Sequence, residues 1–225
     1  MPANPLTDQC TADKQERIYM LTRHPQRHLV ESFIGKRYMD DYGAKLSHFC
    51  TQLVISVFGT QLQAAIGYER ADQQPLFLEQ YFSLPVEQLI AQASNTPCTR
   101  SQIVEVGNLA SDSPGALRRF ILILGRYFVQ QQYQWVVFTA IPSLLNTFEK
   151  FNVPLFELGI ADPQALGDKA EHWGNYYSKS PKVMAAHIST GMAILQRNEM
   201  LSKLIEVQPR PQALSMNYED RLCLK

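Results

Sequence analysis

The run Ile103-Val104-Glu105-Val106-Gly107-Asn108 opens the stretch that decides the fold, which extends from Ile103 to Gly159. The β-branched residues at its start predict a short strand that breaks at Gly107-Asn108. After Pro114-Gly115, apolar residues recur every three or four positions over 116–131, which predicts an amphipathic helix. A sheet is expected to cover the wide apolar face of this helix.

The second half of the stretch continues the same alternation. The continuous apolar run Trp135 to Thr139 is typical of a buried central strand. A second amphipathic helix is expected around 144–151, and a last strand at Leu155–Leu158. Strands alternating with helices after an antiparallel start predict an α/β fold in three layers, with a mixed central sheet flanked by helices on both faces.

The segments outside this stretch supply further elements and the domain limits. One domain is expected at 16–190, between a flexible leader at 1–15 and a C-terminal helix end and tail at 191–225. The segment 76–82 suits either a strand or a helix. The other expected elements are an edge-like strand at 17–21, a helix at 29–42 that stops at Gly43, a hairpin of strands 53–58 and 62–68, a helix at 86–93, and a helix-compatible run at 183–206.

Composition excludes several classes of protein. Lys and Arg number 21, as do Asp and Glu, so the formal net charge is zero, which argues against a nucleic-acid partner. The four cysteines are scattered without CxxC spacing, which is consistent with reduced cytosolic thiols. The five histidines are dispersed, so no metal site is expected. With no secretory signal and no apolar run of about 20 residues, a cytoplasmic location is expected, and secretion by another route stays open.

The turn before the 116–131 helix is a candidate anion site. A helix that starts after Pro114 leaves the backbone N–H groups of Gly115, Ala116 and Leu117 at the positive end of its dipole. Such a terminus suits a phosphate or pyrophosphate.

An alternative interpretation of the same turn involves no ligand. Ser113 or Asp112 caps the helix, as these residue types usually do at this position. Arg118 and Arg119 then form a solvated face instead of adding charge to a phosphate contact. Both interpretations fit the local sequence.

Glu105 is the candidate general base, because it is a carboxylate within an otherwise apolar strand. Partial burial beside a cleft would raise its pKa and allow it to accept a proton from an attacking amine. Gly107 permits a β-bulge, which would part the strand from its neighbour and open a slot. The alternative is that Glu105 is simply the polar half of strand alternation.

Four motifs follow one another along the chain: Pro75-Leu76-Phe77-Leu78-Glu79-Gln80-Tyr81, Val104-Glu105-Val106-Gly107-Asn108-Leu109-Ala110, Trp135-Val136-Val137-Phe138-Thr139-Ala140 and Trp173-Gly174-Asn175-Tyr176-Tyr177. Over roughly residues 25–190, the chain with these motifs resembles the bacterial thermostable hemolysin (delta-VPH-like) family. By name, the resemblance implies lysis of red blood cells.

The chain also resembles, more distantly, the GNAT acyltransferases and the acyl-homoserine-lactone synthases that share their fold. Glu105 matches an acidic active-site residue of the synthases, and Arg70 is similar to an arginine that follows their third strand. Asn108 replaces another of their arginines, and their phosphate loop is reduced here to Pro114-Gly115-Ala116. The resemblance implies a GNAT-like fold and a thioester co-substrate, either acyl-CoA or an acyl carrier protein.

These observations and resemblances give one expected site. Tyr176 joins Glu105 as a catalytic residue, because GNAT enzymes often use a tyrosine as general acid; aromatic packing beside Trp173 is the alternative. The expected donor-binding residues are Val106, Gly107, Asn108, Leu109, Gly115, Ala116, Leu117 and Arg118, and the expected substrate-binding residues are Arg70, Phe77, Glu79 and Tyr81.

Three functions remain open at this level. The first is an acyltransferase that moves an acyl group from a thioester to a small amine, with an acyl carrier protein as a partner. The second is a cytolytic protein that contacts membranes through a helix at 116–131 or 183–206, although the apolar face of the first helix is explained more simply as core. The third is a ligand-binding module without catalysis. A surface-active acylated product would reconcile hemolysis with the first function.

Overall fold

A single mixed sheet organises the chain, in the strand order β6-β7-β5-β4-β3-β2-β1-β8. The computed structural model describes residues 16–59, 61–197 and 212–213, with the backbone only at Pro114, Leu117, Arg118, Gln212 and Ala213. The pairs β4–β5 and β1–β8 are parallel, and the other neighbours are antiparallel. The strands are β1 (Glu16–Leu21), β2 (Gln52–Phe58), β3 (Gln61–Arg70), β4 (Ile103–Ser111), β5 (Trp135–Ala140), β6 (Phe156–Ile160), β7 (Lys182–His187) and β8 (Gln212–Ala213).

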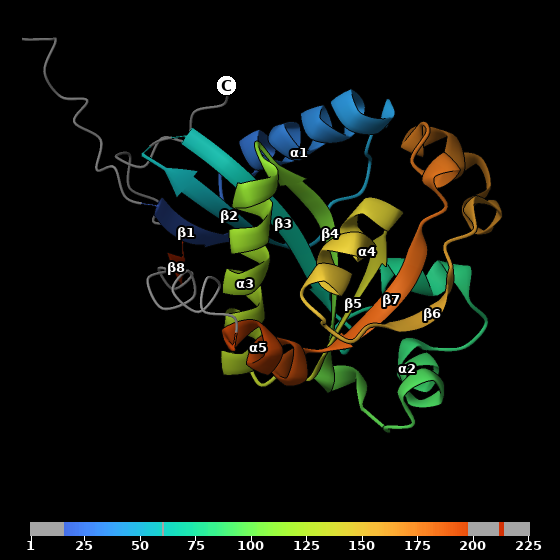
Figure 1. Ribbon diagram of the computed structural model, residues 1–225. Helices are drawn as coiled ribbons and strands as arrows, with labels where there is room; N and C mark the ends of the chain where they lie inside the picture. Colours follow the sequence, from blue (N-terminus) through green and yellow to red (C-terminus); the bar gives the residue numbers. More distant parts are fainter. Residues whose placement is uncertain (1–15, 60, 198–211, 214–225) are drawn as a thin grey trace, which may run out of the picture.

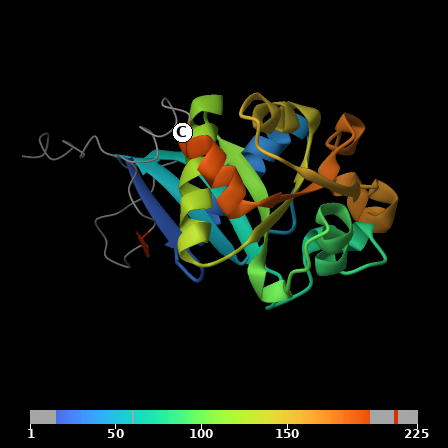
Figure 2. The same cartoon turned by 60° about the horizontal axis from the view of Figure 1, so that its bottom comes forward.

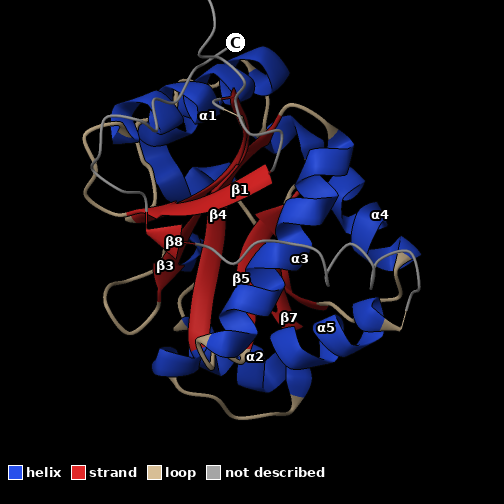
Figure 3. Ribbon diagram, turned by 90° about the vertical axis from the view of Figure 1, so that its left-hand side faces the viewer, coloured by secondary structure: helices blue, strands red, loops and turns tan. Residues whose placement is uncertain are grey.

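Helices cover both faces of this sheet, as expected (Figures 1 and 3). We call the face covered by α3, α4 and α5 the α3 face, and the face covered by α1 and α2 the α1 face. The helices are α1 (Arg27–Tyr42), α2 (Val86–Ser94), α3 (Pro114–Gln130), α4 (Pro142–Lys150) and α5 (Ile188–Gln196), with the 3-10 segments η1 (Phe77–Tyr81), η2 (Arg100–Gln102), η3 (Pro163–Trp173) and η4 (Tyr177–Lys179).

Most of the expected elements are confirmed. The hairpin of β2 and β3 forms, and α1 ends at Tyr42 with Gly43 as its C-cap, whose φ of 65° suits a glycine. The amphipathic helix is α3, and its apolar residues Phe120, Leu124 and Phe128 are buried against the sheet. The undecided segment 76–82 contains the 3-10 helix η1. The leader at 1–15 and residues 198–211 and 214–225 of the C-terminal region lie outside the described residues.

The helix expected from residue 183 is wrong over its first turns. Residues 182–187 form β7 between β5 and β6, and the helix α5 begins only at Ile188. The run Val183 to Ala186 is buried throughout, because helices cover both faces of the sheet here. A short apolar run of this kind has the same pattern in a buried strand and in a buried helix, so periodicity cannot distinguish them.

The break expected at Gly107-Asn108 is also corrected. β4 continues through both residues to Ser111 and stays paired with β3. The register shifts between the pairs Gly67–Gly107 and Ala65–Ala110, so β4 carries one extra residue, a β-bulge. Asn108 adopts a φ of 49°, a left-handed conformation that asparagine tolerates better than most residues.

Candidate functional site

β4 and β5 part in the middle of the sheet. Their parallel pairing runs from Ile103–Trp135 to Val106–Phe138 and ends there, although β4 continues to Ser111 and β5 to Ala140. The bulge in β4 begins directly after the last pair. The two strands therefore part where the bulge begins, and in the described part of the chain no strand pairs with β4 on that side beyond Val106.

The side chain of Asn108 fixes the bulge from the α1 face. Its Oδ1 accepts a hydrogen bond from the backbone N–H of Cys50 at 2.8 Å, and its Nδ2 donates to the carbonyl of His48 at 3.2 Å. We call residues 44–51, which connect α1 to β2, the strap. Asn108 is buried beneath the strap, so its side chain holds this connection and is not free to contact a donor as expected.

Gly67 lets the strap approach the sheet. A Cβ at Gly67 would lie 2.7 Å from Cys50 Cβ and 2.9 Å from Asn108 Oδ1. Any side chain at this position would therefore push the strap or Asn108 away from the bulge.

An apolar cavity of about 130 Å³ lies at the split, mainly on the α3 face. Three of the expected donor-binding residues, Val106, Gly107 and Leu109, line it. Tyr38 also lines it, although α1 belongs to the opposite face, so the cavity reaches through the sheet where the strands part. Its other walls come from Ile66, Ile121, Leu124, Gly125, Phe128, Val136, Phe138, Thr139, Leu144, Phe148, Val153, Ala186, His187, Ile188, Gly191, Met192 and Leu195.

Sequence reasoning missed Tyr38 and the α5 residues of this cavity. Tyr38 lies far from β4 in sequence, and it meets the bulge through a hydrogen bond with the backbone of Leu109. Burial raises the pKa of the Tyr38 phenol, and this hydrogen bond acts in the opposite direction. No local motif around Tyr38 signals this contact.

Glu105 is buried on the α1 face, with 6% of its surface exposed. Its two carboxylate oxygens accept hydrogen bonds from the backbone N–H groups of Phe77, at 2.7 Å, and Leu78, at 3.1 Å. Burial raises its pKa to about 8, the two N–H groups oppose this rise, and the nearby carboxylates Glu69 and Glu79 add to it. Glu105 therefore supports the start of η1, and it lines neither this cavity nor the polar cavity described next.

The polar cavity, of about 440 Å³, lies on the α1 face. Its buried carboxylate is Glu69, which is paired across the strands with Glu105 and accepts a hydrogen bond from the Thr51 backbone N–H. Phe77, from the expected substrate-binding set, lines the cavity, which also contains Leu46, Ser47, His48, Gln74, Pro75, Leu76, Gln80, Leu166, Lys169, His172 and Trp173. Sequence reasoning singled out Arg70, which follows Gly67-Tyr68-Glu69, and missed Glu69. Successive side chains of a strand point to opposite faces, so Glu69 lies on the α1 face because Tyr68 lies on the α3 face.

Aromatic side chains connect the polar cavity to the split. Trp173 packs 5.6 Å from Phe77 and 5.4 Å from Tyr176, measured between ring centroids. Tyr176 is buried, and its hydroxyl donates to the carbonyl of Thr139, which lies just beyond the last β4–β5 pair, at 3.5 Å. Burial raises the pKa of Tyr176, so it remains protonated. Tyr176 thus packs in an aromatic cluster and also reaches the split.

Tyr81, the third aromatic residue of the expected site, belongs to the same cluster. Its hydroxyl lies 2.6 Å from the hydroxyl of Tyr177, and burial raises its pKa. Tyr81 therefore lies near Phe77 and Tyr176, but it lines neither of the two cavities.

The expected substrate-binding residues Glu79 and Arg70 have internal partners instead. Glu79 accepts hydrogen bonds from the backbone N–H groups of Leu76 and Val86 and pairs with Arg100 at 2.6 Å. Burial opposes ionisation of Glu79, but Arg100 and the N–H groups outweigh it and lower its pKa. Arg70 pairs with Asp72 at 2.8 Å, and strand alternation places it on the α3 face, away from Phe77.

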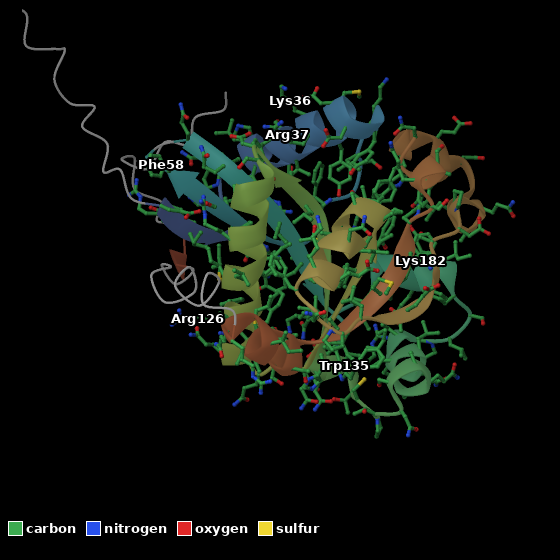
Figure 4. All side chains as sticks on the ribbon, viewed as in Figure 1. Lys36, Arg37, Phe58, Arg126, Trp135 and Lys182 are labelled. Atoms are coloured by element: carbon green, nitrogen blue, oxygen red, sulfur yellow. The ribbon has the colours of Figure 1, made fainter. Side chains whose placement is uncertain are left out.

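The start of α3 follows the capping interpretation. Ser113 Oγ accepts a hydrogen bond from the Ala116 backbone N–H at 3.2 Å, so this amide is not free in the structure, contrary to expectation. Asp112 pairs with Arg37 of α1. Figure 4 labels Arg37, where α1 passes the start of α3. Arg119 Nε lies 3.6 Å from Glu16.

In the described part of the chain, no three His, Cys, Asp or Glu side chains are grouped so that they could hold a metal ion. Within the same residues, no helix combines the length and the apolar character that crossing a bilayer requires.

The family model described as Thermostable hemolysin matches residues 20–192 of the chain. No curated protein matches the sequence significantly.

Several solved structures share the fold. An N-acyl amino acid synthase from uncultured soil microbes, FeeM, has a TM-score of 0.58 at 11% identity, covering 84% of this chain and 98% of its own. The CoA-dependent acyl-homoserine lactone synthase BjaI, with MTA, has a TM-score of 0.59 at 10% identity, covering 92% and 97%. The acyl-homoserine lactone synthase LasI has a TM-score of 0.54 at 12% identity, covering 79% and 91%. The GNAT-like fold expected from the sequence is therefore confirmed.

The pH dependence of stability tests the environment of Glu105. Because its pKa rises from the ordinary 4.5 to about 8 on folding, the folded state keeps a proton that the unfolded state loses above pH 4.5. Its contribution to the free energy of unfolding should therefore be complete below about pH 4.5 and fall as the pH rises to about 8. Glu105→Gln has no such proton, so the melting temperature of the wild type relative to this variant should fall between pH 5 and pH 8.

Glu79→Gln is the matched comparison, because the pKa of Glu79 is shifted in the opposite direction. The melting temperature of the wild type should exceed that of this variant by less and less as the pH falls through the lowered pKa of Glu79. A difference between wild type and Glu105→Gln that stays constant from pH 5 to pH 8.5 would contradict the assigned environment of Glu105.

Proposed function

This chain belongs to the thermostable hemolysin family, and we propose that it is an acyltransferase that moves an acyl group from a thioester donor to a small amine. The observation that carries the proposal is the parting of β4 and β5 after Val106–Phe138, with an apolar cavity at the split and a polar cavity on the α1 face. The fold shared with acyl-transferring synthases supports it as an analogy.

The donor occupies the split in this proposal. Its acyl chain enters the apolar cavity past Val106, Gly107 and Leu109, and the thioester lies between the parted strands. The backbone amides of Gly115 and Leu117 bind the donor's phosphate at the start of α3, and the Ala116 amide joins them when Ser113 releases it. The side chain of Arg118, which was expected to bind the donor, lies outside what the structure describes. Either acyl-CoA or an acylated carrier protein can present such a chain.

The acceptor amine occupies the polar cavity. The amine nitrogen attacks the thioester carbon, the C–N bond forms and the C–S bond breaks, and an amide and a thiol leave. Glu69 lines this cavity and takes the proton of the amine, with Glu105 beside it as a second carboxylate whose pKa near 8 keeps it largely protonated at neutral pH. Two neighbouring carboxylates with different environments suit acid–base chemistry.

Tyr176 supplies the proton for the leaving thiolate. Its hydroxyl lies at the split through its contact with the Thr139 carbonyl, and its raised pKa keeps it protonated until the thiolate forms.

Filling the apolar cavity should abolish donor binding. Leu144 and Leu145 are neighbours on α4, both half-buried, and of the two only Leu144 lines the cavity. Leu144→Trp should therefore lose the rise in melting temperature that a saturating acyl-CoA gives the wild type, and Leu145→Trp should keep it. Equal shifts in both variants would show that the acyl chain binds elsewhere.

Removing the proposed base should lower turnover without affecting the donor. Glu69→Gln should reduce the rate of thiol release in the presence of an amine by about 100-fold or more, the usual range for a general base, while acyl-CoA still raises the melting temperature. Glu105→Gln should also lower turnover with donor binding retained. Glu149→Gln, at an exposed position on α4, is the control. Unchanged turnover in Glu69→Gln would remove Glu69 from the proton path.

Hemolysis, for which the family is named, is indirect in this proposal. The apolar residues of α3 that would have to insert into a membrane, such as Phe120 and Phe128, are buried in the core. Purified protein should release no dye from liposomes unless it is supplied with a thioester and an amine whose product is surface-active. Leakage caused by the protein alone would favour direct cytolysis.

A further inference from the structure

The apolar cavity is bounded by α5 on the side away from the split. Figures 1 to 3 show α5 lying across the C-terminal half of α3. The cavity walls at this crossing are Gly125 of α3 and Ile188, Gly191, Met192 and Leu195 of α5. The residues at the split, such as Gly107 and Thr139, lie on β4 and β5. A chain that enters at the split and follows the cavity therefore meets α5 last.

Met192 closes this end by resting on Gly125. A Cβ on Gly125 would lie 2.6 Å from Met192 Sδ and 3.5 Å from its Cγ, so the thioether occupies the space that a side chain at residue 125 would take. Met192 is 6% exposed and lines the cavity. Methionine is unbranched and flexible, which makes it a deformable end wall.

The volume and the lining limit what this cavity can hold. An apolar cavity of about 150 Å³ accommodates benzene, so the observed 130 Å³ corresponds to roughly six carbon atoms. The walls are almost entirely aliphatic or aromatic, and His187 already has Thr190 Oγ1 as a partner at 2.9 Å. An oxo or hydroxyl group deep in the cavity would find few hydrogen-bond partners, which is costly.

We propose that the acyl group is an unsubstituted chain of about four to six carbons, and that Met192, resting on Gly125, sets its upper length. This inference rests on the proposed function, because it assigns the substrate class of the same donor site. Met192 is a specificity-determining residue in this account.

The test is binding of an acyl-CoA series, from acetyl-CoA to dodecanoyl-CoA, by isothermal titration calorimetry with CoA as the baseline. For the wild type, affinity should rise about fourfold with each added methylene that is buried and stop rising near six carbons. Met192→Ala should move this limit to chains about three atoms longer, the number of heavy atoms that the truncation removes.

Two further variants make the test specific. Gly125→Ala should push the Met192 thioether into the cavity and shorten the limit, and the double variant Gly125→Ala, Met192→Ala should lengthen it again. Met184→Ala is the matched control, because Met184 is equally buried, at 6% exposed, but does not line the cavity. Its length limit should equal that of the wild type.

The outcomes separate this inference from the proposed function. The role of Met192 is overturned if the wild type binds acyl-CoA with a length limit that Met192→Ala and Gly125→Ala leave unchanged. It is also overturned if Met184→Ala moves this limit as far as Met192→Ala does. In either case the acyltransferase proposal stands. If no acyl-CoA or acyl-pantetheine binds more tightly than its unacylated form, the proposed function itself fails, and the length limit fails with it.

Discussion

The loss of pairing between β4 and β5 after Val106–Phe138 is the constraint on which the rest of the site depends. The extra residue at the bulge turns β4 away, and the buried Asn108 side chain locks the bulge to the strap. Gly67 allows the strap to lie close enough for these hydrogen bonds. Because parallel strands normally stay paired through the centre of a sheet, this separation is a built feature, and it connects the two faces of the molecule.

The two faces at the split have different chemistry. On the α3 face, apolar residues of three helices surround the cavity, and this environment favours a hydrocarbon chain. On the α1 face, Glu69 and Glu105 lie side by side on neighbouring strands, and η1 is held by the carboxylate of Glu105. In the proposed reaction, an apolar thioester at the split meets a polar amine, and the rings of Phe77, Trp173 and Tyr176 lead from the polar cavity to the split.

The fold could be predicted from the sequence where long periodic segments determine it. The stripe of α3, the apolar run of β5 and the hairpin of β2 and β3 all have local signals, and the structure contains them. β7 could not be assigned, because a four-residue buried run carries no period that distinguishes a strand from a helix. The bulge was anticipated from Gly107. Beyond the bulge, β4 continues because it stays paired with β3, and no local sequence pattern reveals this pairing.

The site was predicted less completely, since its members meet only in three dimensions. Val106, Gly107 and Leu109 could be grouped from the sequence because they lie in one strand, and they line the apolar cavity. The ion pair of Glu79 could not be read from the sequence, because its partner, Arg100, is 21 positions away. The roles of Tyr38, Glu69 and Met192 depend on which face of a strand or helix they occupy, and therefore on the packing of distant elements.

A crystal structure with a non-hydrolysable thioether analogue of hexanoyl-CoA would test the central claim most directly. The account predicts that the sulfur lies between β4 and β5 beyond Val106–Phe138, with the chain in the apolar cavity and its end against Met192. An analogue bound with its chain outside this cavity, or with β4 and β5 paired beyond Phe138, would contradict the account.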